Sequence, residues 1–271
     1  MKKRSSSPRG VRKETSDPAL IVRKIYHKLS RTWGPQHWWP AETPFEVIVG
    51  AILTQNTLWT NVERAIRNLR LSDSLSIDGI RAAGLRELEL LVRPSGYFRQ
   101  KAKRLKEFIA FIDKQYGGSL AAMLATPTLE LREELLAQKG IGPETADSIL
   151  LYAGHHPIFV VDAYTRRVLE RHDAIHPKST YDEIRGMVED ALSTAEPGVI
   201  DDFVVLDPGR PAVHEPSRMS TAGKSELAQT YNEMHGLFVQ LGKHYCSKQN
   251  PQCEVCPLGP MLKRGLTKSR V

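Results

Sequence analysis

One aspartate in this chain is placed where a carboxylate can do chemistry. Asp162 follows the apolar run IFVV (residues 158–161) and stands where the next helix is expected to begin. A carboxylate beside a sugar can stabilise the positive charge that develops as a glycosidic bond breaks, and it can orient a water molecule for attack. The alternative role is structural, since aspartate is a common N-cap residue.

A tight turn is predicted shortly before this aspartate, in the stretch ELLAQKGIGPETADSILLYAG. Gly140 and Gly142 are predicted to allow the positive φ angles of the turn, and Pro143 suits the first position of the second helix. Such a turn leaves unpaired backbone N–H groups at a helix N-terminus, which is a favourable site for a phosphate. The sequence therefore places a carboxylate near a turn that can bind a phosphate.

The elements that must position these residues are all predicted to be helices. Apolar residues recur at helical spacing, while proline, glycine and capping residues mark the helix ends. No strand-like alternation and no internal repeat is present, so the predicted fold class is all-α. Helices are expected from Pro18 and Pro44, over about 100–116 and 119–127, on both sides of the turn, after Asp162, from Thr180 and over about 225–245. Residues 196–222 are expected to form a long loop that is functional or mobile.

Several motifs together resemble a known family. The hairpin followed by VVDAYTRR (residues 160–167) resembles the helix-hairpin-helix and catalytic-aspartate signature of the endonuclease III superfamily of base-excision DNA glycosylases. The motifs WWP (38–40), LTQNT (53–57) and RPSGYFRQKAKRL (93–105) resemble one branch of it, the 3-methyladenine DNA glycosylases related to endonuclease III. The similarity extends from about Trp38 to about Cys256, which is most of the chain.

This resemblance implies an all-α fold of two helical lobes with a DNA cleft between them. A six-helix lobe that contains the hairpin is expected over residues 41–156. The second lobe is expected to join residues 18–40 to residues 157–262, which include the cysteine loop. Residues 1–17 are polar and basic without periodicity, so we expect a disordered tail there, and a second tail over 263–271.

The resemblance also implies a DNA N-glycosylase that initiates base excision repair, with Asp162 as its catalytic residue. In bifunctional members a lysine two residues after the second hairpin glycine forms a Schiff base with the sugar. Glu144 occupies that position here, and a carboxylate cannot form an imine. We therefore expect base removal by water, without AP lyase activity. The alternatives are an endonuclease III-type glycosylase and lyase for oxidised pyrimidines, and a noncatalytic protein that binds damaged DNA.

A base pocket follows from the same resemblance. Trp38 or Trp39, together with Trp59, matches the aromatic residues that sandwich the extruded base. Lys243 matches a lysine near the pocket. Stacking a cation on tryptophan contributes about 0.5–2 kcal/mol, so tryptophans with Glu144 nearby favour a cationic alkylated purine such as 3-methyladenine over a neutral oxidised pyrimidine. The structural alternatives are core tryptophans, a surface lysine, and a glutamate that interacts with the helix macrodipole.

Contacts with double-stranded DNA are expected from two further places. Gln55 matches the glutamine that enters the duplex where the target base has left, and a solvated helix C-terminus is the alternative. In the hairpin, DNA contacts are expected from Lys139, Gly140, Gly142 and Thr145. On the helix expected over 100–116, a solvated basic face is the simplest interpretation, with phosphate contact as the alternative, for Lys101, Lys103, Arg104 and Lys106.

The three cysteines follow the spacing Cys246-x6-Cys253-x2-Cys256, which resembles the iron–sulfur loop of endonuclease III. That pattern continues x5-Cys, and Leu262 stands at the last position here. A [4Fe–4S] cluster normally takes four thiolates. Three alternatives stay open: a cluster that is labile or completed by another ligand, a Cys3His zinc site with His244, and a vestigial loop held by packing.

The composition agrees with a nucleic-acid partner. The chain has 271 residues, a formal net charge of +7 and a pI of about 9.3, which suit a polyanion. Hydrophobic residues make up 41%, which excludes wholesale disorder. The longest apolar run, Val47 to Leu53, is too short to span a bilayer, and no secretory signal follows the first basic residues. We expect a monomer in the cytoplasm, associated with the nucleoid, that binds damaged DNA and no membrane.

Overall fold

The computed structural model of the protein describes residues 17–193 and 214–262. These ranges contain helices and turns and no β-strand, which confirms the all-α prediction. No helix within them is long and apolar enough to cross a membrane. Both predicted tails, apart from residue 17, and most of the predicted 196–222 loop lie outside the described residues.

In chain order the helices are α1 (Pro18–Trp33), α2 (Pro44–Leu53), α3 (Trp59–Leu71), α4 (Ile77–Ala82), α5 (Leu85–Leu91), η1 (Arg93–Ser95), α6 (Phe98–Tyr116), α7 (Leu120–Leu124), α8 (Thr128–Leu136), α9 (Pro143–Ser148), η2 (Ile149–Ala153), α10 (Ala163–Arg171), α11 (Tyr181–Ser193), α12 (Arg218–Thr221), α13 (Glu226–His244) and η3 (Gly259–Met261).

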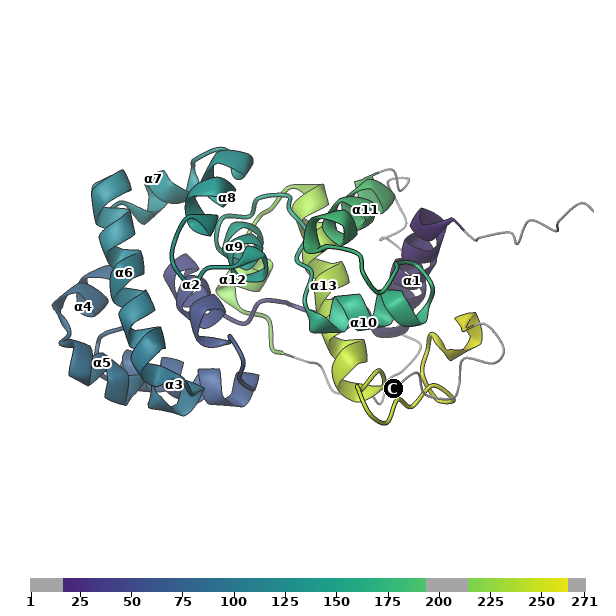
Figure 1. Ribbon diagram of the computed structural model, residues 1–271, viewed down its shortest axis with the longest axis horizontal. Coiled ribbons are helices and arrows are strands. Elements are labelled where there is room, and N and C mark those ends of the chain that lie inside the picture. The colour runs from purple at the N-terminus through teal and green to yellow at the C-terminus, as the bar shows by residue number, and fades with distance from the viewer. Residues whose placement is uncertain (1–16, 194–213, 263–271) are drawn as a thin grey trace, which may run out of the picture.

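The helices form two groups that lie side by side along the long axis of the molecule (Figure 1). Helices α2 to α9, with η2, make up one group, here called the hairpin lobe. Helices α1, α10, α11 and α13 make up the other group, here called the second lobe. This arrangement confirms the predicted two-lobed fold. We propose residues 41–156 for the hairpin lobe, and 18–40 with 157–262 for the second lobe.

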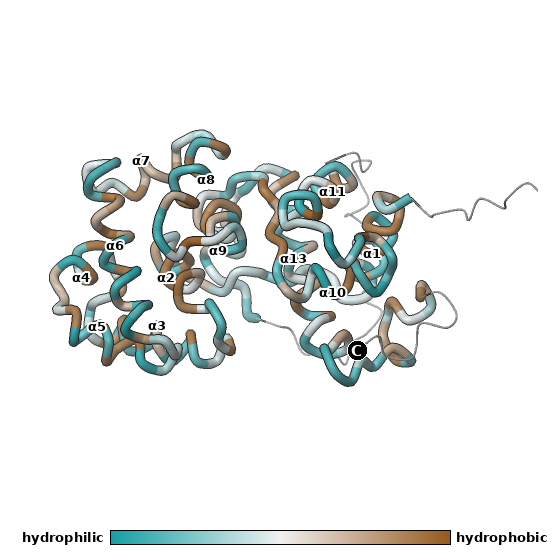
Figure 2. The backbone as a smooth tube through the Cα atoms, in the orientation of Figure 1, coloured by the Kyte–Doolittle hydropathy of each residue, from teal (hydrophilic) through white to brown (hydrophobic). Residues whose placement is uncertain are grey.

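One hydrophobic core runs through both lobes. Every residue of α2 from Phe45 to Leu53 is buried. Helix α9 continues into η2, a π-helical turn whose five residues are buried and contact both α2 and α13. Figure 2 shows apolar stretches of α2 and α13 in the middle of the molecule. The residues at the junction of the lobes are therefore held by packing on both sides.

One basic residue of α6 is buried, so the predicted solvated face was wrong at that position. Lys101 is 1% exposed, and its Nζ donates hydrogen bonds to the carbonyl oxygens of Leu53 (2.8 Å) and Ser95 (2.6 Å). Burial, with a smaller effect of the Arg104 charge, lowers the pKa of Lys101 to about 8. The ammonium group binds carbonyls that end α2 and η1, which is a structural role.

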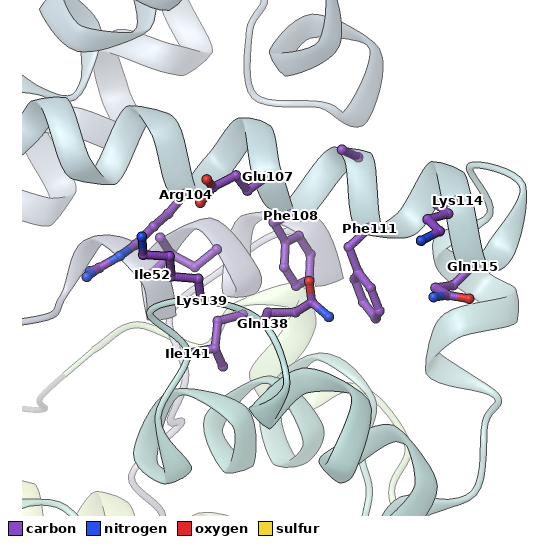
Figure 3. Close-up of a pocket in the computed structure, with 11 residues that line it drawn as sticks. Ile52, Arg104, Glu107, Phe108, Phe111, Lys114, Gln115, Gln138, Lys139 and Ile141 are labelled. Atoms are coloured by element: carbon purple, nitrogen blue, oxygen red, sulfur yellow. The ribbon is translucent and has the colours of Figure 1, made fainter.

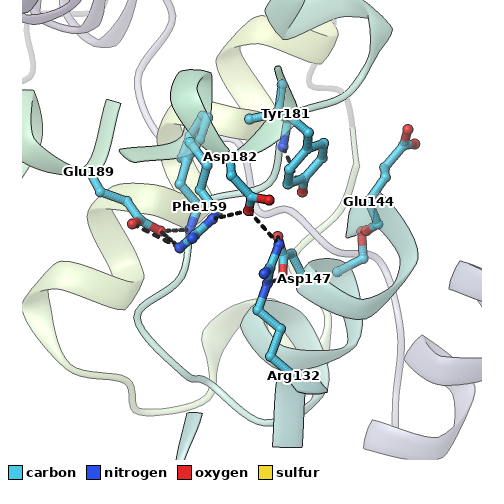
Figure 4. Close-up of polar contacts among 10 residues, drawn as sticks. Arg132, Glu144, Asp147, Phe159, Tyr181, Asp182 and Glu189 are labelled. Carbon is cyan, nitrogen blue, oxygen red and sulfur yellow. Dashed lines mark hydrogen bonds and ion pairs between the residues drawn. The ribbon is translucent and has the colours of Figure 1, made fainter. Parts of the chain in front are cut away.

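A network of ion pairs joins the hairpin lobe to the second lobe (Figure 4). Arg132 of α8 donates from Nε to Oδ1 of Asp147 in α9 (2.7 Å), and the Asp147 side chain has no exposed surface. The same guanidinium donates from Nη2 to Oδ1 of Asp182 in α11 (2.8 Å), whose side chain is 59% exposed. Arg132 thus bridges the lobes with one buried and one exposed ion pair.

The segment that leads into Asp162 is held by main-chain hydrogen bonds to α11. The Phe159 N–H donates to Oε1 of Glu189 (2.8 Å), and the Val161 N–H donates to the hydroxyl oxygen of Tyr181 (3.3 Å). Burial, and then the negative charge of Asp147, raise the pKa of Tyr181 well above 10. The backbone before Asp162 is therefore held by side chains of α11, the helix that the Arg132 ion pair joins to the hairpin lobe.

Helices α10 and α13 approach closely because α13 has a glycine at the contact. A Cβ on Gly242 would lie 2.1 Å from Cδ1 and 2.8 Å from Cβ of Tyr164, so any other residue would displace α10. His235 lies seven residues earlier, two turns away on the same face of α13. That face contacts α10 at Tyr164 and approaches Asp162 at the N-terminus of α10.

Candidate active site

The hairpin between α8 and α9 forms the predicted tight turn, but only one of its glycines has a positive φ angle. Gly140 has φ +85°, as predicted, whereas Gly142 has φ −94° and is the N-cap of α9, so the prediction was wrong for Gly142. A Cβ on Gly140 would meet the Arg104 guanidinium at 2.3 Å, whereas a Cβ on Gly142 would meet nothing within 4 Å. No side chain caps α9, so the N–H groups of its first turn are available to an anion.

We predict that alanine substitutions at the two glycines separate folding from DNA binding. Gly140→Ala should lower the free energy of unfolding by about 1–2 kcal/mol, because alanine disfavours the left-handed conformation. Gly142→Ala should change it by less than about 1 kcal/mol, since the backbone suits any residue. Its methyl group would stand in open space at the uncapped N-terminus of α9, where it should crowd a bound phosphate and weaken binding to duplex DNA about tenfold. Urea unfolding and fluorescence anisotropy with a labelled duplex measure both effects; equal DNA affinities of Gly142→Ala and wild type would contradict this account.

Gln55 is brought to the hairpin, 85 residues away in sequence. Its Nε2 donates to the carbonyl oxygen of Gly140 (3.0 Å) and to Oγ1 of Thr145 (2.9 Å), and the Arg104 guanidinium donates to its Oε1. Lys139 is exposed beside them. The predicted DNA-contacting residues of both motifs therefore lie together, with the Gln55 side chain bound to the hairpin.

Asp162 caps helix α10 and still presents one free oxygen. Its Oδ1 accepts a hydrogen bond from the Thr165 N–H (2.7 Å), so the structural role considered for it is present. Its Oδ2 lies 3.7 Å from Nε2 of His235, and the side chain keeps 13% of its surface exposed. One oxygen is thus occupied by the helix, while the carboxylate remains accessible for chemistry.

The three predicted pocket tryptophans form one aromatic cluster. Trp38 and Trp39 are each 5% exposed, and Trp59 is half-buried. The ring centroids of Trp39 and Trp59 are 5.0 Å apart and nearly perpendicular, and those of Trp38 and Trp59 are 6.3 Å apart. Gly50 makes room for them, since a Cβ there would lie 3.2 Å from the Trp39 ring. A base between parallel rings needs about 7 Å, two contact distances of about 3.5 Å, so these rings must separate to admit one.

The two predicted charged residues of the pocket lie near this cluster and Asp162. Glu144 keeps exposed surface, yet crowding by surrounding protein, and then the negative charge of Asp162, raise its pKa to about 7. The Nζ of Lys243 lies 5.6 Å from the Trp38 ring centroid. Burial lowers the pKa of Lys243 below its ordinary value. The negative charges of Glu63 and Asp162 offset part of this effect. The fold therefore gathers the predicted pocket residues around Asp162.

Three residues of this site were not predicted from the sequence. His235 and Tyr152 lie against Asp162 and the tryptophans, and the His214 ring centroid is 5.3 Å from that of Trp38. Burial, with the charge of Lys243, lowers the pKa of His214 to about 4. A single histidine or tyrosine among apolar residues is typical of a core, so no sequence signal distinguishes them.

A cavity of about 370 Å³ lies elsewhere, between α6 and the turn before α9 (Figure 3). Phe108 and Phe111 point into it from α6, and Arg104 and Lys139 also line it. Neither Asp162 nor any of the tryptophans lines it. It is therefore not the predicted base pocket.

The cysteine loop does not fit an iron–sulfur cluster as the described residues arrange it. No group of three or more His, Cys, Asp or Glu side chains in residues 17–193 and 214–262 is placed to hold a metal ion. The sulfur of Cys246 accepts a hydrogen bond from Arg171 (3.0 Å), and burial raises the pKa of the Cys256 thiol to about 11. Since a [4Fe–4S] cluster normally takes four thiolates, Leu262 at the fourth position leaves the donor set incomplete.

Comparisons with known proteins agree with this architecture. Residues 49–193 match the family described as HhH-GPD superfamily base excision DNA repair protein. A Methanocaldococcus jannaschii protein, described as a candidate DNA repair glycosylase (MJ1434), is 41% identical over 88% of this chain and 94% of its own. Endonuclease III of Thermotoga maritima is 25% identical over 79% of each chain.

Solved structures show the same fold. The H. pylori 3-methyladenine DNA glycosylase bound to 1,N6-ethenoadenine is 30% identical, with a TM-score of 0.63 over 84% of this chain and 97% of that chain. A trapped covalent intermediate of endonuclease III with DNA has a TM-score of 0.66 at 21% identity, over 90% of this chain and 95% of that chain. Together with the family match, these relatives confirm the family predicted from the motifs: the chain is a DNA repair glycosylase of the HhH-GPD superfamily, related to endonuclease III.

Proposed function

We propose that this glycosylase is monofunctional and releases alkylated purines, of the 3-methyladenine kind, from duplex DNA. The observation that carries the proposal is the placement of Glu144. A carboxylate, rather than a lysine, occupies the first turn after the hairpin, close enough to Asp162 that their charges interact. An acid at this place supplies no Schiff-base amine, and it attracts a cationic base. The relative that binds 1,N6-ethenoadenine, a modified purine, supports this substrate class.

The chemistry proposed for Asp162 is stabilisation of the sugar cation. As the bond between base and deoxyribose breaks, positive charge develops on the sugar, and the Oδ2 side of the carboxylate faces that charge. The same carboxylate orients the water that attacks the sugar carbon. An N3- or N7-alkylated purine already carries positive charge, so it leaves without a strong general acid. Trp38, Trp39 or Trp59 would stack on it.

DNA binding is proposed to use the hairpin and the face between the lobes. The uncapped N-terminus of α9 is suited to a phosphate, with Lys139 and Gln55 beside it. Base flipping costs a few kcal/mol and is easiest for a damaged base. Binding should weaken by about 0.9 log units per log unit of salt for each phosphate contact on duplex DNA.

A panel of duplexes with single defined lesions tests the proposal. We expect release of 3-methyladenine, 7-methylguanine or 1,N6-ethenoadenine under single-turnover conditions, with strand breakage only after alkali. The panel includes oxidised pyrimidines, 8-oxoguanine, and uracil or thymine opposite guanine. Preferred release of an oxidised pyrimidine, 8-oxoguanine, uracil or thymine would overturn the substrate class. Binding without release from any duplex would identify a noncatalytic damage-binding protein.

The absence of lyase chemistry is a separate prediction. With borohydride present during turnover, the wild-type protein should form no covalent adduct with DNA, since Glu144 cannot form an imine. Glu144→Lys places an amine at the same position and should give a trapped adduct that is retained on a denaturing gel. A covalent adduct of the wild-type protein would show that another amine attacks the sugar, and the monofunctional assignment would be wrong.

The rate of release should depend on pH through Glu144, whose pKa is raised to about 7. The ionised form predominates above that pKa, so the attraction for a cationic purine is present at higher pH and is lost as pH falls through about 7. We expect kcat/KM for 7-methylguanine to rise across this range in the wild type and to lose that rise in Glu144→Gln. A wild-type profile that falls with pH would instead indicate that Glu144 donates a proton to a neutral leaving base.

A further inference from the structure

We propose that His235 is a positioning residue for Asp162, held by Tyr152 in the tautomer whose Nε2–H faces the carboxylate. The inference rests on the proposed function, since it assigns a role at the same catalytic carboxylate. It adds two residues, from α13 and η2, to which the family resemblance assigned no role.

The contacts of His235 form a buried chain that ends at Asp162. The Tyr152 hydroxyl lies 2.6 Å from Nδ1 of His235, and Nε2 lies 3.7 Å from Oδ2 of Asp162. Tyr152 is 1% exposed and His235 is 4% exposed. Nε2 is shielded from solvent and has no hydrogen-bond partner in the described part of the chain. A buried ring nitrogen without a partner, directed at the catalytic carboxylate, calls for a functional explanation.

The protonation of both side chains follows from their surroundings. Burial raises the pKa of Tyr152 well above 10, so its hydroxyl keeps its proton. Burial lowers the pKa of His235 below its ordinary value, more than the Asp162 charge raises it, so the ring is neutral near pH 7. A neutral imidazole whose Nδ1 accepts from the Tyr152 hydroxyl carries its proton on Nε2. The opposite tautomer would direct a lone pair at a carboxylate, which is unfavourable.

The charged surroundings of His235 are simple. The groups that face it are Trp38 in the segment after α1, Tyr152 in η2, and Phe159 and Asp162 before α10. Only Asp162 among them is charged at neutral pH. The Nε2 atom of His235 therefore faces a single charged group, Oδ2 of Asp162.

The two oxygens of Asp162 thus have different partners. Oδ1 is bound to the N-terminus of α10 through Thr165, and Oδ2 faces the His235 donor. The 3.7 Å separation exceeds the hydrogen-bond range of about 2.7–3.2 Å, and catalytic hydrogen bonds commonly shorten when substrate binds. We infer that this bond forms as DNA closes the site, which orients the carboxylate toward the sugar.

Three variants test the role by single-turnover base release on the lesion identified by the panel. His235→Phe removes the donor, and we expect a rate about 10–100-fold lower, the range that one hydrogen bond to a charged group contributes. His235→Gln keeps an N–H near the Nε2 position and should retain most of the rate. Tyr152→Phe removes the hydroxyl that fixes the tautomer of His235, and its rate should lie between those of the two His235 variants.

His172 provides the matched control, because it is also shielded and has an unpartnered ring nitrogen, at the opposite end of α10. His172→Phe should leave the rate unchanged. Lesion binding should stay within about threefold in all variants. Equal rates for His235→Phe and wild type, or a failure of His235→Gln to restore the rate, would overturn the proposal.

Imidazole ¹⁵N–¹H NMR of the wild-type protein tests the tautomer without activity. A proton on Nε2 of His235 supports the proposal, and a proton on Nδ1 overturns it, even if the Phe variant does not fold. If no lesion is released by the wild type, the proposed function fails. The NMR result then shows separately whether the Tyr152–His235 geometry holds.

Discussion

Asp162→Asn is expected to abolish base release and to leave the fold and lesion binding in place. The neutral amide cannot stabilise the developing sugar cation, so the single-turnover rate should fall about a thousandfold or more. Removal of a single hydrogen-bond donor to the charge of a transition state already lowers the rate by a factor of about 10²–10³. Asparagine caps a helix as well as aspartate does, so the Thr165 N–H keeps its acceptor and the free energy of unfolding should change by less than about 0.5 kcal/mol.

A second N-cap aspartate supplies the control for this substitution. Asp17 caps α1 by accepting from the Ala19 N–H, and it is solvent-exposed. Asp17→Asn makes the same chemical change and should leave both base release and stability unaltered. If Asp162→Asn retains more than about a tenth of the wild-type rate of base release, while Asp17→Asn has the wild-type rate, another group stabilises the sugar cation.

Asp147→Ala is expected to produce the largest loss of stability. It leaves the Arg132 guanidinium, whose side chain is 12% exposed, without its buried partner. Removal of one member of a buried ion pair costs about 3–5 kcal/mol, and here the desolvated guanidinium keeps only its exposed partner, Asp182. Burial raises the pKa of Asp147 more than Arg132 lowers it, which reflects the same desolvation. Urea unfolding followed by circular dichroism measures the change.

The matched variant is Asp182→Ala, because Asp182 binds the same guanidinium at 2.8 Å on the exposed side. Exposed ion pairs contribute about 0–1 kcal/mol, so this variant should be close to wild type. Each variant removes one ion pair of Arg132, so the comparison measures the effect of burial alone. Similar losses of stability in both variants would show that burial of the partner carboxylate does not determine the contribution of the ion pair.

Local features of the fold were predictable because short-range rules govern them. Prolines and capping residues mark helix starts, and α1 and α2 begin at Pro18 and Pro44, with caps from Asp17 and Thr43. The hairpin and the placement of Asp162 at the start of α10 follow from motifs of a few neighbouring residues. Even here the backbone differed at Gly142, because a single glycine with positive φ is enough to close the turn.

Side-chain partners distant in sequence were not predictable from local patterns. Lys101 lies four and eight residues before the buried Leu105 and Ile109, so helical spacing places it on the inner face of α6. Only the fold supplies the carbonyl oxygens at the ends of α2 and η1 that bind its ammonium group there. Gln55 is suited to a solvated helix end, yet its amide binds the hairpin carbonyl of Gly140. Each outcome depends on which groups the folded chain places within hydrogen-bond distance.

The amino-acid sequence by itself determined the all-α class, the hairpin, the family, and Asp162 as the catalytic candidate, since these depend on residues close together in the chain. Only the tertiary structure decided that Tyr152 and His235 meet, 83 residues apart, behind that carboxylate. The same holds for the ion pairs that join the lobes through Arg132. The physical reason is that a local pattern specifies backbone conformation and buried faces, whereas the packing of α13 against η2 and α10 selects which polar groups face each other in the interior.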